Sequence, residues 1–358
     1  ASGSVDVTYR GIFQKILAGN IVKTLVKASR HSGKIGGTIS RYSDSPERNG
    51  IPAKQFAVIA EDEDELHVQM AKYEPDNIRL IAAVDDTLAK GHESWAWYGI
   101  RPIHLGLHEG GTLLVVTNHE RAKLLEVIPA LPFEWQLALL PGEKSFSGLW
   151  VYHDDGTEYR VLGAIARLIP EVVSLEDLEK EVGKGPKAEQ HLEWLRQGYR
   201  EVQVSRVPAG VGAANAYEPV HLPAWNEMAE AIIVPAPPVG GRQEAFKKFT
   251  TRSERPVVNF DVCTQCKQCF MECPDSVFEL TPEGYYRVEY EACCGCGICA
   301  EVCPVDDCIV MVDELAFADN HDLYGDWKAD REGYRQFFQR LLERERVVAR
   351  SSRRKVNA

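Results

Sequence analysis

Eight cysteines towards the carboxyl end stand in two runs with the same spacing. The runs read CTQCKQCFMECP at 263–274 and CCGCGICAEVCP at 293–304. Both follow C-x2-C-x2-C-x3-C-P, the spacing with which proteins hold cubane [4Fe–4S] clusters. Three closely spaced thiolates lie on one tight loop and can cover three corners of such a cluster. Two runs therefore predict two clusters, and clusters of this kind exchange single electrons.

The fourth cysteine of each run is expected to reach across to the other cluster. By that point the chain has turned away into a helix, and two-cluster ferredoxins use this crossed arrangement. The expected ligand sets are Cys263, Cys266, Cys269 and Cys303 for one cluster, and Cys273, Cys293, Cys296 and Cys299 for the other. Pro274 and Pro304 should divert the chain after each crossing cysteine, since proline fixes φ and donates no hydrogen bond. Gly295 and Gly297 should let backbone amides approach the cluster sulfurs.

Zinc and disulfides are the alternatives to iron and sulfide. Four-cysteine zinc sites also use C-x2-C pairs, but rarely triplets followed by x3-C-P, and rarely two such runs. All ten cysteines lie within residues 263–308, whereas a secreted, disulfide-stapled protein would spread its cysteines along the chain. The two remaining cysteines, Cys294 and Cys308, are expected to pack as small apolar side chains, with exchange into a ligand set as the alternative.

Around the cysteine runs, the sequence predicts a small α+β domain of the bacterial 2x[4Fe–4S] ferredoxin type over 256–315. Residues 277–280 and 285–290 flank Thr-Pro-Glu-Gly, a pattern that predicts a β-hairpin with Gly284 in the turn. Residues 316–358 should form an extension with an amphipathic helix over 334–342. The basic end at 350–355 is either a solvated tail or an arm that binds a partner.

The first two hundred residues are expected to form one α/β domain with a largely parallel sheet. Strand patterns alternate with helical periodicity, which favours crossover units. The expected strands are 5–9, 55–60, 78–84 and 112–117, and the expected helices are 11–28, 161–167 and one that begins after Ser174. The first strand has alternating apolar residues. Residues 201–255 are rich in Pro and Gly and predict an extended linker that docks on partners, or else a flexible tether.

The bulk composition excludes some classes of partner. A net charge of −12 argues against nucleic acid. The chain has no run of eighteen apolar residues, so no transmembrane helix is expected. The first residues lack the basic and apolar regions of a signal peptide. Together with reduced cysteines and iron–sulfur chemistry, this favours the cytoplasm.

In this order, the pieces resemble the fused gamma–delta subunit of the 2-oxoacid:ferredoxin oxidoreductases, the family of pyruvate synthase. The resemblance is carried by 255–261 leading into Cys263, by 296–305, by 45–54 and by 110–118. The last two are similar to the P-E-R-R-G-x-P and G-G-x-L-I-V-N segments of the gamma part. One segment departs from the family pattern, since residues 10–15 read RGIFQK where a G-R-G-G-Q-G loop is usual. The missing glycines argue against a cofactor contact by this loop.

The resemblance implies a non-catalytic electron-transfer subunit, with no catalytic residue of its own. Thiamine diphosphate and Mg are then expected on partner alpha and beta subunits, which convert a 2-oxoacid and coenzyme A to acyl-CoA and CO2. Ferredoxin or an NAD-linked flavoprotein would accept the electrons. The altered loop favours a divergent branch, such as phenylglyoxylate dehydrogenase, or oxalate oxidoreductase, which needs no coenzyme A. An electron-input subunit of an unrelated reductase and a scaffold protein with structural clusters are the alternatives.

Overall fold

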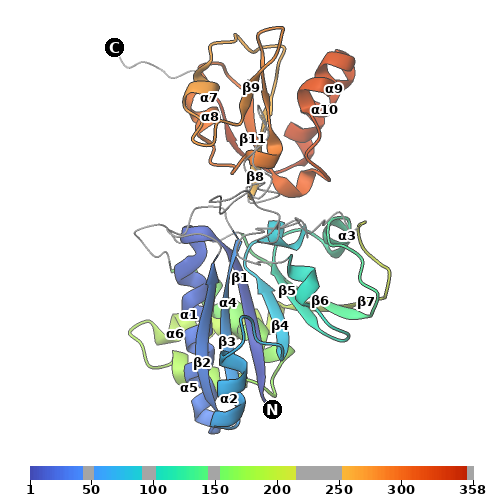
Figure 1. Ribbon diagram of the computed structural model, residues 1–358. Helices are drawn as coiled ribbons and strands as arrows, with labels where there is room; N and C mark the ends of the chain where they lie inside the picture. Colours follow the sequence, from blue (N-terminus) through green and yellow to red (C-terminus); the bar gives the residue numbers. More distant parts are fainter. Residues whose placement is uncertain (43–51, 91–101, 144–153, 215–251, 353–358) are drawn as a thin grey trace, which may run out of the picture. The chain divides into compact units, whose positions relative to one another are not determined.

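The computed structural model describes residues 1–42, 52–90, 102–143, 154–214 and 252–352 (Figure 1). These residues divide into two compact units, one within 1–214 and the other within 252–352. Most of the family-like segment at 45–54, most of the predicted linker and the end of the basic tail lie outside the described residues.

The first unit is built on a seven-stranded sheet in the order β2-β3-β1-β4-β5-β6-β7. Its strands are β1 (Gly3–Arg10), β2 (Ile35–Tyr42), β3 (Pro52–Ala60), β4 (Ile78–Ala83), β5 (Thr112–Val116), β6 (Trp135–Leu140) and β7 (Gln203–Val207). The pairs β1–β4, β4–β5 and β5–β6 are parallel. The pairs β2–β3, β3–β1 and β6–β7 are antiparallel. The expected α/β fold is confirmed, with a parallel centre and antiparallel flanks.

Helices cover both faces of this sheet. The helices that pack together on one face are α1 (Gly11–Ser29), α4 (Thr157–Leu168), α5 (Leu175–Val182) and α6 (Ala188–Glu201). Neighbouring residues of a strand point to opposite faces. A Cβ at Gly36 would meet Val26 of α1, whereas a Cβ at Gly37 would meet Met70 of α2 (Glu63–Met70). Helix α2 therefore lies on the other face of the sheet from α1.

Strand β1 is more deeply buried than its alternating pattern indicates. All eight of its residues are buried, because it lies between β3 and β4 and has covered faces on both sides. The polar residues of β1 are consequently paired inside the unit. Lys54 on β3 lies 3.3 Å from Asp6, and Thr8 donates a 2.8 Å hydrogen bond to the same carboxylate.

Three strands of the first unit, β2, β6 and β7, were not expected from the sequence. Strand β6 occupies an interior position of the sheet, and β7 pairs with it antiparallel. Strand β7 falls within the stretch whose composition predicts a linker. Its five residues, QVSRV, have no alternation of apolar and polar side chains that would stand out from the Pro- and Gly-rich residues that follow.

The second unit combines a three-stranded antiparallel sheet, in the order β12-β11-β8, with a separate hairpin. Its strands are β8 (Glu254–Val258), β9 (Phe278–Leu280), β10 (Tyr286–Val288), β11 (Ile309–Asp313) and β12 (Val347–Arg350). Strands β9 and β10 pair antiparallel, and Gly284 has a φ of +87° in their turn. The predicted hairpin is confirmed. A left-handed turn residue is the reason for a glycine at this position.

Helices of two kinds complete the second unit. The short helices α7 (Gln268–Met271) and α8 (Ile298–Val302) each follow a cysteine loop. The longer α10 (Arg331–Arg344) follows α9 (Leu323–Ala329), and it buries Tyr334, Phe338 and Leu341 while exposing its charged side chains. This confirms the predicted amphipathic helix. Among the described residues, no helix is long and apolar enough to cross a membrane.

Candidate metal centres

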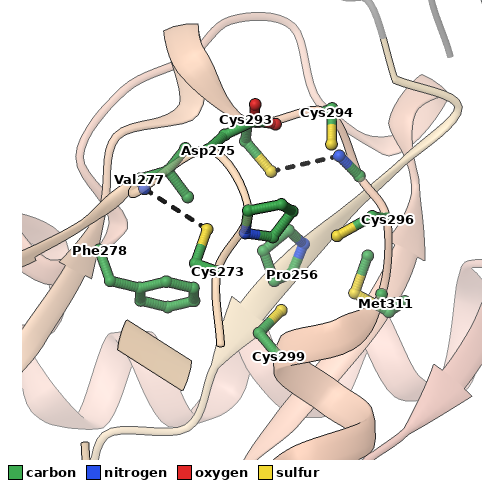
Figure 2. A pocket seen from close by; sticks show the side chains of 13 residues that line it. Pro256, Cys273, Asp275, Val277, Phe278, Cys293, Cys294, Cys296, Cys299 and Met311 are labelled. Atoms are coloured by element: carbon green, nitrogen blue, oxygen red, sulfur yellow. Dashed lines mark hydrogen bonds between the residues drawn. The ribbon is translucent and has the colours of Figure 1, made fainter. Parts of the chain in front are cut away.

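Four cysteines from both runs line one cavity of the second unit (Figure 2). Cys273 comes from the turn between α7 and β9, whereas Cys293 and Cys296 lie in the loop before α8 and Cys299 lies within α8. This is the set predicted for the second cluster. Pro256, Val277, Phe278 and Met311 also line the cavity, so its walls are largely apolar.

The other predicted set lines a second cavity. Cys263, Cys266 and Cys269 come from the first loop and α7, and Cys303 comes from the turn after α8. The structure thus brings each predicted set together, with three cysteines of one run and the fourth of the other. The crossing occurs because each short helix carries the chain from one cavity to the next.

Both cysteine loops turn through left-handed backbone at equivalent positions. Gln265 and Lys267 have φ of 57° and 69°, and Gly295 and Gly297, thirty residues later, have φ of 70° and 79°. A left-handed residue reverses the loop within two or three positions, which keeps the flanking cysteines on the same cavity. The two runs therefore share their backbone shape as well as their spacing. Only the second run supplies glycine for it.

Backbone donors already point at sulfur in the second cavity. The Gly295 N–H donates to Cys293 Sγ at 3.4 Å, and the Val277 N–H donates to Cys273 Sγ at 3.5 Å (Figure 2). Such hydrogen bonds favour the charged, thiolate form of a cysteine. Burial works against it and raises the pKa of the Cys293 thiol to about 11, while the nearby Arg252 charge opposes this rise.

Each cavity is lined by a fifth cysteine. Cys308 is buried against the first set, and its thiol donates to the Asn259 carbonyl at 3.8 Å. Cys263 and Cys303 both lie within hydrogen-bonding reach of the Cys308 thiol, and this interaction lowers the pKa of Cys263 to about 7 and that of Cys303 to about 6. Cys308 therefore packs as expected, but directly against the predicted ligands.

Cys294 is the fifth cysteine of the second cavity. Its hydrogen bond to Cys296 lowers the pKa of the Cys296 thiol to about 6 and raises that of Cys294 itself. Asp275 is a further hydrogen-bond partner of Cys294 and raises its pKa in the same direction. The preferred thiolate in this pair is thus Cys296, a predicted ligand.

The donor sets fit iron–sulfur clusters. All ten cysteines are free thiols, and thiolate is the ligand that such clusters require. Within the described part of the chain, no group of three or more His, Cys, Asp or Glu side chains converges as around a single metal ion. The cysteines are instead spread around the two cavities. A bound [4Fe–4S] cluster would supply reversible one-electron transfer, and the residues would supply its ligands, its apolar surroundings and its N–H donors.

Sequence reasoning missed a group of buried charges beside the second cavity. Arg252, Arg255 and Glu314 are fully buried and form an ion-paired cluster. The signal in the sequence was an R-S-E-R segment at 252–255 that runs into strand β8 and on towards a cysteine run. It is too short to distinguish from an ordinary charged loop.

In the first unit, residues 10–15, which lack the glycines usual in the family, lead directly from β1 into α1. Arg10 is buried, donates a 2.9 Å hydrogen bond to Thr87 Oγ1 and lies 3.8 Å from Asp85. The Gln14 side chain accepts the Arg10 N–H at 2.7 Å. The Arg10 and Gln14 side chains are therefore engaged within the unit itself.

Comparison with known proteins gives a match for the second unit and relatives for the cysteine-rich part. Residues 256–311 match the 4Fe-4S dicluster domain family. The pyruvate synthase subunit PorD of Methanothermobacter marburgensis is 39% identical over 65 residues, which are 18% of this chain and 75% of the relative. PorD of Methanocaldococcus jannaschii is 33% identical over 60 residues, 17% of this chain and 70% of the relative.

Two further similarities are to a subunit of a different enzyme and to a solved structure. The NADH-dependent phenylglyoxylate dehydrogenase subunit delta of Aromatoleum evansii is 42% identical over 53 residues, 15% of this chain and 56% of the relative. Among solved structures, pyruvate oxidoreductase subunit PORC of Thermotoga maritima shares 23% identity and a TM-score of 0.40, covering 57% of this chain and 98% of that one. The PorD relatives, together with the dicluster match, show that this chain belongs to the 2-oxoacid:ferredoxin oxidoreductase family, as an iron–sulfur, electron-transfer subunit of an oxidoreductase.

Proposed function

We propose that this chain is the fused gamma–delta subunit of a thiamine-diphosphate-dependent 2-oxoacid oxidoreductase. The reaction is 2-oxoacid + coenzyme A → acyl-CoA + CO2 + H+ + 2 electrons. Two electrons leave for each 2-oxoacid consumed, and they pass one at a time through this subunit to an acceptor. Thiamine diphosphate and Mg belong to partner alpha and beta subunits.

The arrangement of cysteines in the second unit carries this proposal. Two cavities, each lined by three cysteines of one run and one of the other, support two [4Fe–4S] clusters held by the predicted ligand sets. Cys266 and Cys296 are exposed, so each site has one edge towards the surface. Apolar residues make up much of the remaining walls, which limits the water that reaches the sites.

The proposed division of the chain follows the same reasoning. The delta-like ferredoxin domain is centred on 256–315 and the gamma-like domain on 1–200, extended by β7 (Gln203–Val207). The connection expected at 201–255 then begins after β7, and the extension expected at 316–358 adds β12 to the sheet of the second unit. The gamma-like domain has a structural role against the partner subunits. Ten free thiols support a reducing compartment, and we place the protein in the cytoplasm.

Substrate and acceptor are set by other subunits, and two branches of the family are favoured by different observations. The PorD relatives, which are pyruvate synthase subunits, support pyruvate, and the family resemblance favours ferredoxin as acceptor. The delta-subunit relative from Aromatoleum evansii and the altered 10–15 segment support phenylglyoxylate, with an NAD-linked flavoprotein as acceptor. Oxalate, without coenzyme A, is the remaining alternative.

Viologen reduction by the anaerobically purified native assembly tests the proposal. Pyruvate, phenylglyoxylate and oxalate would each be supplied with and without coenzyme A. Reduction that requires coenzyme A supports an acyl-CoA-forming enzyme, and the active substrate names its branch. Reduction by oxalate alone supports the third alternative. An assembly with full iron content that reduces viologen with none of them, or that holds no thiamine-binding subunits, would contradict the proposal and favour an unrelated reductase.

A further inference from the structure

Three buried side chains form a charged cluster on the strands beside the second cavity. Arg252, Arg255 and Glu314 are all fully buried, with 0% of each exposed. Arg252 Nε lies 2.8 Å from Glu314 Oε2, and Arg255 Nε lies 2.9 Å from the same oxygen. Both guanidinium groups also donate to Oε1 of that carboxylate. One carboxylate thus pairs with two guanidinium groups, and the three side chains together carry one net positive charge.

This charged cluster is joined to the cysteine loop of the second cavity. Arg252 Nη1 donates to the backbone carbonyl of Cys293 at 3.3 Å, and also to that of Tyr290. A Cβ at Gly295 would meet Arg252 Cβ and the Glu254 carbonyl, so the loop packs directly on the segment that carries the arginine. The guanidinium of Arg252 therefore contacts the backbone of a predicted ligand.

The surroundings of the cluster keep its charge in a low-dielectric environment. The Arg255 guanidinium lies 4.7 Å from the centre of the Tyr290 ring and 4.3 Å from that of Phe317. Arg255 Nη1 donates to the Asp319 carbonyl at 2.9 Å. Aromatic rings and backbone carbonyls thus surround it. Charges held in this way are screened by solvent and salt much less than charges at the surface.

The charged side chains that line the two cavities are more exposed to solvent than Arg252 and Arg255. Asp275 lines the second cavity and is half-buried, and Lys267 lines the first and is exposed. Asp313, next to Glu314, is itself buried, with 2% exposed, and accepts the Leu315 N–H at 2.9 Å. The deeply buried positive charge in contact with a cysteine loop therefore belongs to the second site.

A fixed charge next to a redox centre changes its reduction potential. Taking up one electron makes an occupied site more negative by one charge, and a buried positive charge stabilises that state. We propose that the Arg252–Glu314–Arg255 cluster raises the reduction potential of the second site relative to the first and so directs electrons towards it. This inference rests on the proposed function, because it requires both sites to hold clusters.

Variants that change the charge in opposite directions test this role. Arg252→Met removes a positive charge, and we expect at least a tenfold fall in the ratio of reduced to oxidised second site at a fixed potential, about 59 mV for a one-electron couple. Glu314→Gln removes the negative charge, and the ratio should rise. Arg252→Lys keeps the charge and should restore most of the wild-type potential. Arg287→Gln, at a half-exposed arginine, is the matched control and should change neither site.

The measurement is a redox titration of the anaerobic full chain, followed by EPR spectroscopy, with iron and sulfide analysis of every variant. Cys296→Ser and Cys266→Ser assign the two redox steps to the two sites. If Arg252→Met and Glu314→Gln shift the reduction potential of the second site equally or in the same direction, the charged side chains have only a structural role and the inference is overturned. If Arg252→Met does not fold, Glu314→Gln decides by whether the potential rises. A wild-type chain that holds no iron would instead overturn the proposed function, and this inference with it.

Discussion

Lys267 and Gly297 adopt the same left-handed backbone conformation at equivalent positions of the two cysteine loops, with φ of 69° and 79°. For a residue with a Cβ this conformation costs roughly 1–2 kcal/mol. A Cβ at Gly297 would meet no atom within 4 Å. Substitution there therefore tests backbone strain alone.

Gly297→Ala should destabilise the second unit by about 1–2 kcal/mol. Lys267→Gly should change stability by less than about 1 kcal/mol, because relief of strain is offset by the greater entropy of glycine in the unfolded chain. The readout is anaerobic guanidinium denaturation followed by the visible absorbance of the clusters. Equal midpoints for wild type and Gly297→Ala would contradict the left-handed assignment.

The crossing of α4 and α6 depends on a glycine in each helix. A Cβ at Gly163 would collide with the Leu195 carbonyl, and one at Gly198 with the Arg160 carbonyl. Gly163→Ala should therefore destabilise the first unit by about 1–3 kcal/mol through overpacking. Gly19→Ala in α1, where a Cβ meets nothing within 4 Å, is the matched control. It should stabilise the unit by roughly 0.5–1 kcal/mol. Thermal unfolding would show melting temperatures that move in opposite directions.

The buried pair of Asp6 and Lys54 predicts a strong coupling inside the first unit. Lys54 Nζ lies 3.3 Å from Asp6 and 3.3 Å from Glu74. Lys54→Met would leave the buried Asp6 carboxylate without its positive partner, at a cost of about 3–5 kcal/mol. The double variant Asp6→Asn with Lys54→Met should recover much of this loss. A double-mutant cycle by urea denaturation measures the coupling, and additive losses would refute it.

His321 gives the second unit a pH-dependent contribution to stability. Partial burial lowers its pKa, but ion pairs with Asp319 and Asp326 outweigh this and raise the pKa above its usual value. The stabilisation is therefore complete below the unfolded-state pKa of about 6.5. It is lost as pH rises through the raised folded-state pKa.

The difference in unfolding free energy between wild type and His321→Gln should accordingly shrink as pH rises from about 6 through the raised folded-state pKa of His321. Because the imidazole is half-exposed, solvent screening keeps the effect small. Guanidinium denaturation at a series of pH values measures it. Asp326→Asn should flatten the dependence, and a difference that grows with pH would reverse the assigned sign.

Substitution of Cys308, the fifth cysteine of the first cavity, distinguishes a packing role from a ligand role. Cys308→Ala should retain the iron content of the wild type, because Cys308 is expected to pack behind the first set rather than to ligate. Cys303→Ala in the same cavity should lose iron from the first site. Iron and sulfide analysis of anaerobically purified protein distinguishes the two. Loss of iron from Cys308→Ala would make it a ligand.

The sequence alone determined the features that depend on short-range spacing. Cysteines at fixed intervals, the hairpin turn at Gly284 and the capped helix after Ser174 are specified by neighbouring residues. The Ser174 hydroxyl accepts the Asp177 N–H at 3.1 Å, as its position predicts. These features need no knowledge of distant segments.

The tertiary structure decided what depends on pairing between distant residues. Strand β1 is buried on both faces because β3 and β4 flank it. Residues 203–207 form strand β7 because they pair with the edge of β6. Arg252 and Glu314 are 62 residues apart, and no local pattern pairs them. Their burial beside the second cysteine loop arises because β8 and β11 pair antiparallel, which brings the segments at their ends together.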